Sequence, residues 1–375
     1  MIAAAVFLLS VAFILYILAG YPLLLLLLSR KFPRPIRRAS NPRPVSVLIA
    51  VHNGEEFLEA KIRSVFAANY PRELLEVFIL SDGSTDQTEE IARNIEGVKL
   101  IVLSRQGKAS ALNAGMAAST GEVLLFTDVR QELHPDSIRL LLECLSDPEV
   151  GVVSGALVIR DPSTHDEANT GLYWRYEFWI REKLSSLDSI FGATGALYAV
   201  RRELAVPIPQ GTLLDDMYLP LAAFFRGFRC VVEPQAKMFD YPTALDAEFR
   251  RKVRTLAGNY QILRAYPQLL TAANRLWWHF VSYKFGRLVL PFALIAILVS
   301  GILLPSPWWI PAFGAQVLFY GLAVLDYWIS GGFLKRISSP VRTFVTLMGA
   351  SLLAVLIFFV PSDRLWQQTR VARKA

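Results

Sequence analysis

Apolar positions are distributed unevenly along this chain. Residues 2–29 form an apolar run without a charged side chain, which at about 1.5 Å of rise per residue is long enough to cross a bilayer as a helix. Three more apolar stretches follow near the other end, at 288–304, 308–329 and 344–360. Between the two ends the apolar runs are short and are separated by polar turns. The pattern therefore predicts a globular middle flanked by membrane segments.

The globular middle alternates between short β-rich runs and segments with helical spacing. Strands are predicted at 45–51, 75–80, 98–103, 122–126, 151–159 and 229–233, with another strand entered from the glycine-rich turn at 191–200. Helices are predicted at 55–69, 88–95, 108–119, 173–187, 213–225 and 249–265. Repeated strand–helix units are typical of the α/β class, so we expect a mostly parallel sheet with helices on both faces.

Carboxylates follow two of the predicted strands. Asp128 comes two residues after the strand at 122–126, and Asp82 comes two residues after the strand at 75–80. The carboxyl ends of parallel strands form the edge at which open α/β sheets bind ligands, so the two acids are expected to converge on one crevice. The alternatives are structural. Asp128 would cap the next helix, whose start is marked by Asp136, and Asp82 would take part in simple turn chemistry with Asp86.

Further charged residues open predicted helices. A lysine at a helix start is unfavourable with the helix dipole, so Lys108 is expected to have an anionic partner. Asp215 and Asp216 precede an apolar helix, where an acid is either an N-cap or a general base for an attacking hydroxyl. Carboxylates, a lysine and backbone donors together suit a nucleotide diphosphate with a divalent cation.

Composition and charge indicate a membrane protein and argue against a nucleic-acid-binding protein. The chain is 53% hydrophobic with a net charge of +7. Its densest basic run, between Arg30 and Arg43, directly follows the first apolar segment, which fits a cytoplasmic membrane flank better than a nucleic-acid-binding surface. We therefore expect no nucleic-acid partner. Prolines make residues 31–44 a stiff, extended linker. Cys144 and Cys230 show no metal-ligand spacing and are read as reduced packing residues.

The order of the motifs resembles a known family. VSVLIAVHNGEEFLEAKIRSVFAANYP is followed by ILSDGSTDQT, GKASALNAGMAASTGEVLLFTDVR, GATGALYAVRREL and LLDDMYLPL. This series is similar to the membrane-bound family 2 glycosyltransferases, which include cellulose, hyaluronan and poly-N-acetylglucosamine synthases. The resemblance covers about residues 45–260. It implies a GT-A type nucleotide-sugar-binding domain flanked by transmembrane helices.

The resemblance also implies roles for individual residues. The donor site would comprise Ala50, His52, Asn53, Glu55, Asp82, Lys108, Asp128, Arg130 and Arg251. Asp82 corresponds to the acid that reads the nucleotide base, and Lys108 to a residue near the diphosphate. Asp216 corresponds to the catalytic base of an inverting transfer, with Asp215 beside it, and Arg254 to the retained catalytic arginine of a Q-x-x-R-W motif. Arg254 and Arg251 otherwise belong to a solvated or headgroup-facing basic surface.

The chain departs from the family pattern in three places. The D-x-D metal motif reads Asp128, Val129 and Arg130, so a Mg²⁺ or Mn²⁺ ion would have a single protein carboxylate, and Arg130 can replace part of its charge. The Q-x-x-R-W motif is reduced to residues 251–255 without its tryptophan. Fewer apolar segments follow than in the large channel-forming synthases. The last two departures favour a short transfer to a lipid-linked or membrane-proximal acceptor.

The expected organisation follows the chain. It comprises a transmembrane helix at 1–29, a basic proline-rich linker at 30–44, a cytosolic GT-A domain at 45–265, an interfacial helix at 266–285, two or three membrane spans at 286–360 and a basic tail at 361–375. The third segment is either a full span that leaves the tail outside or a tilted, re-entrant segment that leaves it inside. We expect a multi-pass protein of the inner (plasma) membrane, in contact with membrane lipids.

The function expected from the resemblance is an inverting sugar transfer. The donor would be a nucleotide sugar, with UDP as the expected nucleotide, and the acceptor a polysaccharide or a lipid-linked glycan. The alternative is a catalytically degenerate relative that binds a nucleotide and regulates a membrane polysaccharide assembly complex. Arg130 is the residue that keeps this alternative open. A transporter is disfavoured because only Asp326 brings a charge near the interior of a span.

Overall fold

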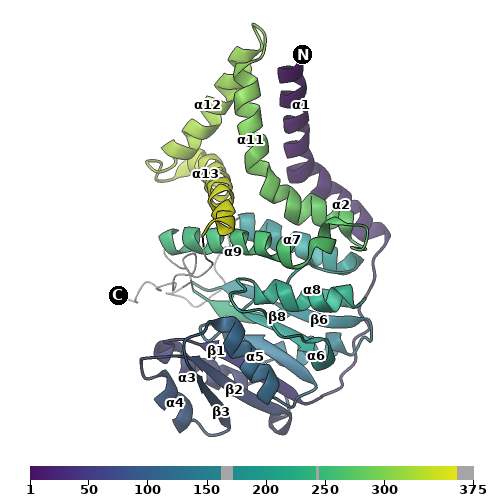
Figure 1. Ribbon diagram of the computed structural model, residues 1–375, viewed down its shortest axis with the longest axis vertical. Helices are drawn as coiled ribbons and strands as arrows, with labels where there is room; N and C mark the ends of the chain where they lie inside the picture. The colour runs from purple at the N-terminus through teal and green to yellow at the C-terminus, as the bar shows by residue number, and fades with distance from the viewer. Residues whose placement is uncertain (162–171, 242–244, 361–375) are drawn as a thin grey trace. The chain divides into compact units, whose positions relative to one another are not determined.

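The computed structural model describes residues 1–161, 172–241 and 245–360 and consists of two compact units (Figure 1). The sheet unit comprises Leu28–Pro242, and the helical unit comprises Met1–Leu27 and Thr243–Ala375. The predicted basic tail at 361–375 lies outside the described residues. The sheet unit contains the strands and all the polar motifs up to residue 241, so it holds the candidate site.

The sheet unit is built on eight strands in the order β3-β2-β1-β4-β7-β6-β8-β5. Their bounds are β1 Val45–Val51, β2 Leu75–Asp82, β3 Val98–Leu103, β4 Val123–Thr127, β5 Glu132–Leu133, β6 Val150–Ile159, β7 Leu197–Arg201 and β8 Arg229–Asp240. The first four strands along the sheet pair in parallel. β7 is antiparallel to both β4 and β6, and β8 is parallel to β6. The parallel half confirms the predicted strand–helix units, and the second half is mixed.

Helices cover both faces of this sheet, as the sequence predicts. Their bounds are α3 Glu55–Phe66, α4 Thr88–Asn94, α5 Lys108–Ala118, α6 Ser137–Leu145, α7 Leu172–Leu187 and α8 Asp215–Phe225, with short 3₁₀ turns η2 Arg72–Leu74 and η3 Arg202–Leu204. Val47 and Ile49 alternate with Leu48 along β1. Val47 and Ile49 pack with apolar residues of α3 and α6, whereas Leu48 lies against Gly115 of α5 on the opposite face.

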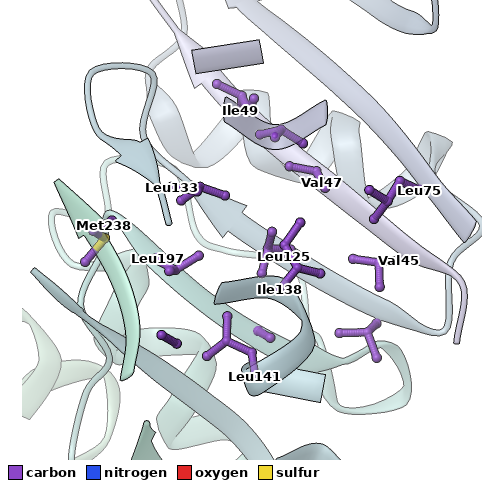
Figure 2. Packing of buried hydrophobic residues seen from close by; sticks show 14 of the residues in the cluster. Val45, Val47, Ile49, Leu75, Leu125, Leu133, Ile138, Leu141, Leu197 and Met238 are labelled. Carbon is purple, nitrogen blue, oxygen red and sulfur yellow. The ribbon is translucent and has the colours of Figure 1, made fainter. Parts of the chain in front are cut away.

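The core on the α3 and α6 face is continuous across the sheet (Figure 2). Leu125 of β4 lies at its centre, with Val45 on the neighbouring strand and Ile138 and Leu141 of α6 around it. All four side chains are fully buried. Burial of this kind is the main favourable contribution to folding.

Truncating the Leu125 side chain at the centre of this core is expected to destabilise the sheet unit. Leu125→Ala should lower the free energy of unfolding by about 3 kcal/mol, because it removes buried methyl groups and leaves a cavity. Urea denaturation of the full chain in detergent, followed by tryptophan fluorescence, measures the change. Val102→Ala on the edge strand β3 is the control: Val102 is 51% exposed, and we expect a loss below about 0.5 kcal/mol. Equal losses in both variants would contradict the placement of this core.

Residues 33–44, which precede β1, form neither helix nor strand, and two of their arginines are paired with acids of the sheet unit. Arg34 forms ion pairs with Asp188 at 2.8 Å and with Glu149 at 2.9 Å. Arg38 lies 2.5 Å from Glu233, a buried carboxylate. These arginines, which we expected at the membrane flank, are thus neutralised by acids that are distant in the sequence.

The helical unit consists mainly of long apolar helices. Its elements are α1 Ile2–Leu15, η1 Tyr16–Gly20, α2 Tyr21–Lys31, α9 Leu245–Ala265, η4 Pro267–Leu270, α10 Trp277–Phe280, η5 Val281–Phe285, α11 Gly286–Ile302, α12 Trp309–Leu325, α13 Gly332–Ala354 and η6 Val355–Phe358, with the end of α2 crossing into the sheet unit. Three continuous helices among the described residues have the length and composition to span a membrane: Ile2–Lys31, Trp277–Ile302 and Gly332–Phe358. The Tyr16 hydroxyl contacts Ser282 Oγ at 2.6 Å and connects the first two of these.

Two of the long helices differ from the segments expected from sequence. The second part of the expected interfacial helix at 266–285, from Trp277 on, is continuous with the span that follows and forms one helix to Ile302, whereas Pro267–Leu270 is a separate 3₁₀ turn. The last helix begins at Gly332, well before the predicted apolar stretch at 344–360, and so includes Lys335 and Arg342. The reason is a buried carboxylate: Asp326 lies 3.0 Å from both Lys335 and Arg342, so their charges are compensated within helical structure.

Candidate active site

The turn after β1 is tied to the loop after β2. Asn53 has a φ of 53°, a left-handed conformation that asparagine tolerates better than most residues. Its side-chain oxygen accepts a hydrogen bond from the Thr85 amide at 2.8 Å. Glu55 accepts another from the Gln87 amide at 2.9 Å, and His52 Nδ1 lies 2.9 Å from the Asp82 carbonyl oxygen. These contacts place the predicted donor-site residues of the two strand ends side by side, with Ala50 next to the end of β1.

Asp82 organises the loop that leads into α5. Its side chain is almost fully buried. One carboxylate oxygen accepts hydrogen bonds from the amides of Gln106 at 2.7 Å and Gly107 at 2.9 Å. The other oxygen lies 3.2 Å from the guanidinium of Arg105. Asp82 therefore fixes the start of α5, where Lys108 is located, and its base-reading role stays a prediction.

Lys108 connects two acids that come from distant parts of the chain. Its ammonium lies 2.9 Å from Asp128 Oδ1, beyond the end of β4, and 3.4 Å from Asp215 Oδ1, at the start of α8. Burial opposes the charge of this lysine, but Asp128 and Asp215 outweigh it, so that its pKa is raised above the usual value. The predicted anionic partners of Lys108 are thus carboxylates in this structure. Asp128 is not the cap of the next helix, because α6 begins only at Ser137.

Asp216 lies beside Asp215 and faces the glycine-rich loop at residues 192–195. Burial, and then the neighbouring charge of Asp215, raise the pKa of Asp216 to about 6, and Lys108 partly opposes this. A Cβ atom on Gly195 would lie 3.0 Å from Asp216 Oδ2, so the loop packs closely against this carboxylate. Neither acid caps α8 through its side chain, since the N-cap position is Leu214. A carboxyl group with this pKa is suited to accept a proton near neutral pH.

Three residues of this region were missed by the sequence analysis. Tyr198 of β7 is fully buried, donates a hydrogen bond to Asp215 Oδ2 at 3.3 Å and stacks on Phe126. Arg181 of α7 donates to Thr194 Oγ1 at 2.8 Å and so supports the glycine-rich loop. No sequence pattern distinguishes either side chain, because each depends on pairing between distant segments.

The third missed residue, Lys61, does have a signal in the sequence. It lies three positions after Leu58 and four before Val65, on the apolar stripe of α3, where a charged residue is unexpected. The structure buries it completely. Burial lowers the pKa of its ammonium to about 7, and attraction to Asp128 and Glu132 partly offsets that effect.

Arg130 has a different environment from its neighbour Asp128. Its guanidinium forms an ion pair with Asp240 at the end of β8, and Gln131 Nε2 donates to the same carboxylate at 2.8 Å. Asp128 stays 39% exposed at its side chain. Among the described residues no group of three or more His, Cys, Asp or Glu side chains is arranged to hold a metal ion. The role of Asp128 as a metal ligand therefore stays a prediction.

The remaining predicted residues lie outside the sheet unit. Arg251 and Arg254 belong to α9 of the helical unit, where the Arg251 carbonyl accepts a hydrogen bond from Thr255 Oγ1 at 2.9 Å. The site described above thus consists of residues from the sheet unit alone, and the roles of the two arginines stay predictions.

Comparisons with protein families and with known sequences all identify glycosyltransferases. Residues 46–206 match the model of glycosyl transferase family 2, and residues 128–358 match that of glycosyl transferase family group 2. Poly-β-1,6-N-acetyl-D-glucosamine synthase of Staphylococcus aureus is 24% identical over 251 residues, which cover 62% of this chain and 60% of that protein. An uncharacterised glycosyltransferase of Nostoc is 32% identical over 133 residues, which cover 34% of this chain and 41% of that protein. The match thus spans about three fifths of the length of the synthase.

A solved structure is similar over nearly the whole chain. It is a mannosyltransferase from Pyrobaculum calidifontis in complex with GDP-mannose and Mn²⁺, with a TM-score of 0.71 and 21% sequence identity. The similarity covers 94% of this chain and 98% of that one. At this level of identity the comparison establishes the fold, which is of the GT-A type, as expected from sequence.

Proposed function

The chain belongs to glycosyl transferase family group 2, and from this premise we propose that it transfers a sugar from a nucleotide-sugar donor to a polysaccharide or lipid-linked acceptor with inversion at the anomeric carbon. UDP is the nucleotide that we propose. The observation that carries this proposal is the cluster around Lys108, in which the lysine contacts Asp128 and Asp215 beside Asp216. It combines a cation for a diphosphate with a carboxylate suited to act as a base.

Each member of the cluster has a defined part in the proposed transfer. The Asp216 carboxylate takes the proton of an acceptor hydroxyl, and the oxygen of that hydroxyl forms a bond to the anomeric carbon. The bond between this carbon and the diphosphate breaks, and the electron pair leaves with the diphosphate. Lys108 neutralises the charge that develops on the leaving group, which is where electrostatic stabilisation lowers the barrier most. Asp215 and Tyr198 hold Lys108 and the start of α8 in position.

A divalent cation is part of the proposal. The similar mannosyltransferase was solved with Mn²⁺, and Asp128 supplies a partly exposed carboxylate just beyond the end of β4. Mg²⁺ and Mn²⁺ bind nucleotide sites through one or two carboxylates together with phosphate oxygens. When bound, such an ion supplies positive charge to the diphosphate. Arg130, held by Asp240, leaves the ion a single carboxylate from this motif.

We also propose that the protein is anchored in the inner membrane by several helices. Within the described part of the chain, three helices have the length and composition to cross a bilayer. The first ends at Arg30 and Lys31, and basic residues stay on the cytoplasmic side of a membrane. This orientation would expose the proposed catalytic domain, residues 45–265, to cytosolic nucleotide sugars.

Release of nucleoside diphosphate tests the proposed reaction. The purified protein in lipid nanodiscs would be assayed with UDP-, GDP- and dTDP-sugars, lipid and sugar acceptors, and either Mg²⁺, Mn²⁺ or EDTA. We expect release from one donor class and loss of release with EDTA. Nucleotide binding without release from any donor would favour the regulatory alternative that Arg130 keeps open. Absence of both binding and release would contradict the assignment of the crevice.

The pH dependence of this activity is expected to follow Asp216. Its pKa is raised to about 6, and only the deprotonated form can accept a proton. The value of kcat/KM should therefore be constant at neutral pH and fall about tenfold per pH unit once the pH is below that pKa. Initial rates at saturating acceptor and limiting donor measure the profile. A flat profile down to about pH 5, with the protein still folded, would argue against a carboxylate base.

A further inference from the structure

The most unusual buried group outside the proposed reaction is the ammonium of Lys61. This lysine belongs to α3, and its side chain is fully buried. Its Nζ atom donates to Thr127 Oγ1 at 2.6 Å and to the Gln131 carbonyl oxygen at 2.6 Å. Asp128 and Arg130 lie between these two acceptors in the chain. Lys61 therefore clamps both ends of the segment at residues 127–131, which we call the donor-side turn.

A third hydrogen bond connects Thr127 with the residue that follows the glycine-rich loop. Thr127, which is also buried, donates its hydroxyl proton to the Ala196 carbonyl oxygen at 2.7 Å. Ala196 directly follows the glycine-rich loop at residues 192–195, which lies against Asp216. In this loop the amide of Ala193 donates to the Asp216 carbonyl oxygen at 2.6 Å. A chain of contacts thus connects Lys61 with the donor-side turn, the glycine-rich loop and α8.

The chemistry of this connection explains why a lysine is used. An apolar side chain in place of Lys61 would leave Thr127 Oγ1 and the Gln131 carbonyl oxygen without their buried hydrogen-bond donor. The threonine hydroxyl has one proton, which it gives to Ala196, so its lone pairs need a donor from elsewhere. Lys61 supplies two donors from one atom and reaches both ends of the turn. The Thr127 hydroxyl and the Gln131 carbonyl oxygen therefore both depend on the Lys61 ammonium for a buried hydrogen-bond donor.

We propose that Lys61 is a positioning residue that, through Thr127, sets the separation between the donor-side turn with Asp128 and the glycine-rich loop beside Asp216. Because its side chain is fully buried, Lys61 would act through the turn and not by touching the nucleotide sugar or the acceptor hydroxyl. Its effect would be on the alignment of the leaving diphosphate with the attacking hydroxyl, because small displacements of reacting groups lower rates strongly. The kinetic part of this proposal rests on the proposed glycosyl transfer, and the structural part does not.

Four variants test the proposal in the full chain in nanodiscs. Lys61→Met keeps the length and apolar stem of the side chain but removes its donors. Thr127→Val removes the relay with almost no change in shape, and it keeps the test valid if Lys61→Met fails to fold. Thr127→Ser retains the hydroxyl and is the conservative rescue. Lys99→Met is the matched control, since Lys99 is paired with Glu76 on the edge of the sheet.

Hydrogen exchange measured by mass spectrometry gives a readout that needs no activity. In Lys61→Met and Thr127→Val, we expect peptides covering residues 127–133 and 192–197 to exchange about tenfold faster than in the unchanged protein. Peptides from β2 should not change, and Thr127→Ser and Lys99→Met should resemble the unchanged protein. Faster exchange at 127–133 alone, with 192–197 unaffected in both variants, would overturn the proposed connection.

Kinetics then test the positioning role. We expect kcat for donor turnover to fall about tenfold in Thr127→Val and Lys61→Met, with the KM of the acceptor changed by less than about twofold and with recovery in Thr127→Ser. Altered exchange with unchanged kcat would reduce Lys61 to a purely structural residue. If the unchanged protein turns over no donor, the proposed function fails, whereas the exchange experiment still decides whether the connection exists.

Discussion

Replacement of Asp216 by asparagine is expected to lower kcat for donor turnover by about 10³-fold, within the range that positioned general bases contribute. Asparagine keeps the shape of the side chain and its contact with Gly195 but cannot accept the proton of an acceptor hydroxyl. Binding of the nucleotide should change by less than about twofold, because the Lys108 contacts with Asp128 and Asp215 are retained. Diphosphate release and calorimetric nucleotide binding, measured on the same preparation, separate the two effects.

The matched control for this change is Glu96→Gln. Glu96 is an exposed carboxylate between α4 and β3, so its conversion to an amide should leave kcat unchanged. A second comparison is Asp215→Asn, which removes a partner of Lys108 and is expected to weaken donor binding as well as kcat. If Asp216→Asn keeps half of the activity or more while Asp215→Asn loses it, then Asp215 is the base and our assignment within the pair is wrong.

Removal of the Lys108 charge is the second change from which we expect a large loss of activity. Lys108→Met should lower kcat/KM by about 10²-fold to 10³-fold, as for other groups that stabilise developing negative charge. The variant loses the cation placed near the leaving diphosphate and leaves Asp128, Asp215 and Asp216 without their shared counter-charge. Since Lys108 opposes the upward shift of the Asp216 pKa, that pKa should rise further. The acidic limb of the pH–rate profile should therefore move to higher pH.

Lys108→Arg, which keeps the positive charge, is the conservative comparison for this prediction. It should retain more activity than Lys108→Met and should leave the acidic limb near that of the unchanged protein. Lys99→Met controls for the loss of a lysine that has an acidic partner elsewhere in the sheet unit. A decrease in kcat/KM of less than about threefold in Lys108→Met would show that the lysine serves only to hold the two acids.

The mixed half of the sheet shows where sequence patterns were insufficient. We predicted a strand at 229–233, but β8 continues to Asp240 despite Pro234. Proline lacks the amide donor of a regular ladder and is tolerated at irregularities, and the pairing of β6 with β8 contains a register shift after Ser154. The extension matters because it brings Asp240 to Arg130. No local pattern around Pro234 indicates that a partner strand accommodates it.

Two acids of the proposed site were singled out from sequence because strand ends have a local signature. A short β-rich run that stops at an acid is visible without a structure, and in a parallel sheet such ends meet at one edge. Asp82 and Asp128 were singled out on this basis, and they lie at the ends of two strands that both pair with β1. The contact between Lys108 and Asp215 has no such signature, because it joins α5 to α8 across a long stretch of sequence.

By itself, the sequence determined the class of fold, the family and the presence of apolar helices near both ends, since these depend on periodicity, composition and the order of local motifs. The tertiary structure decided which charges face one another. It paired Arg34 and Arg38 with acids of the sheet unit instead of leaving them for lipid headgroups, and it directed Arg130 to Asp240. It also placed Lys61 beneath the turn that carries Asp128. Such pairings depend on distances of a few ångströms between segments far apart in the chain, and the strength of a charge interaction depends on that distance and on burial.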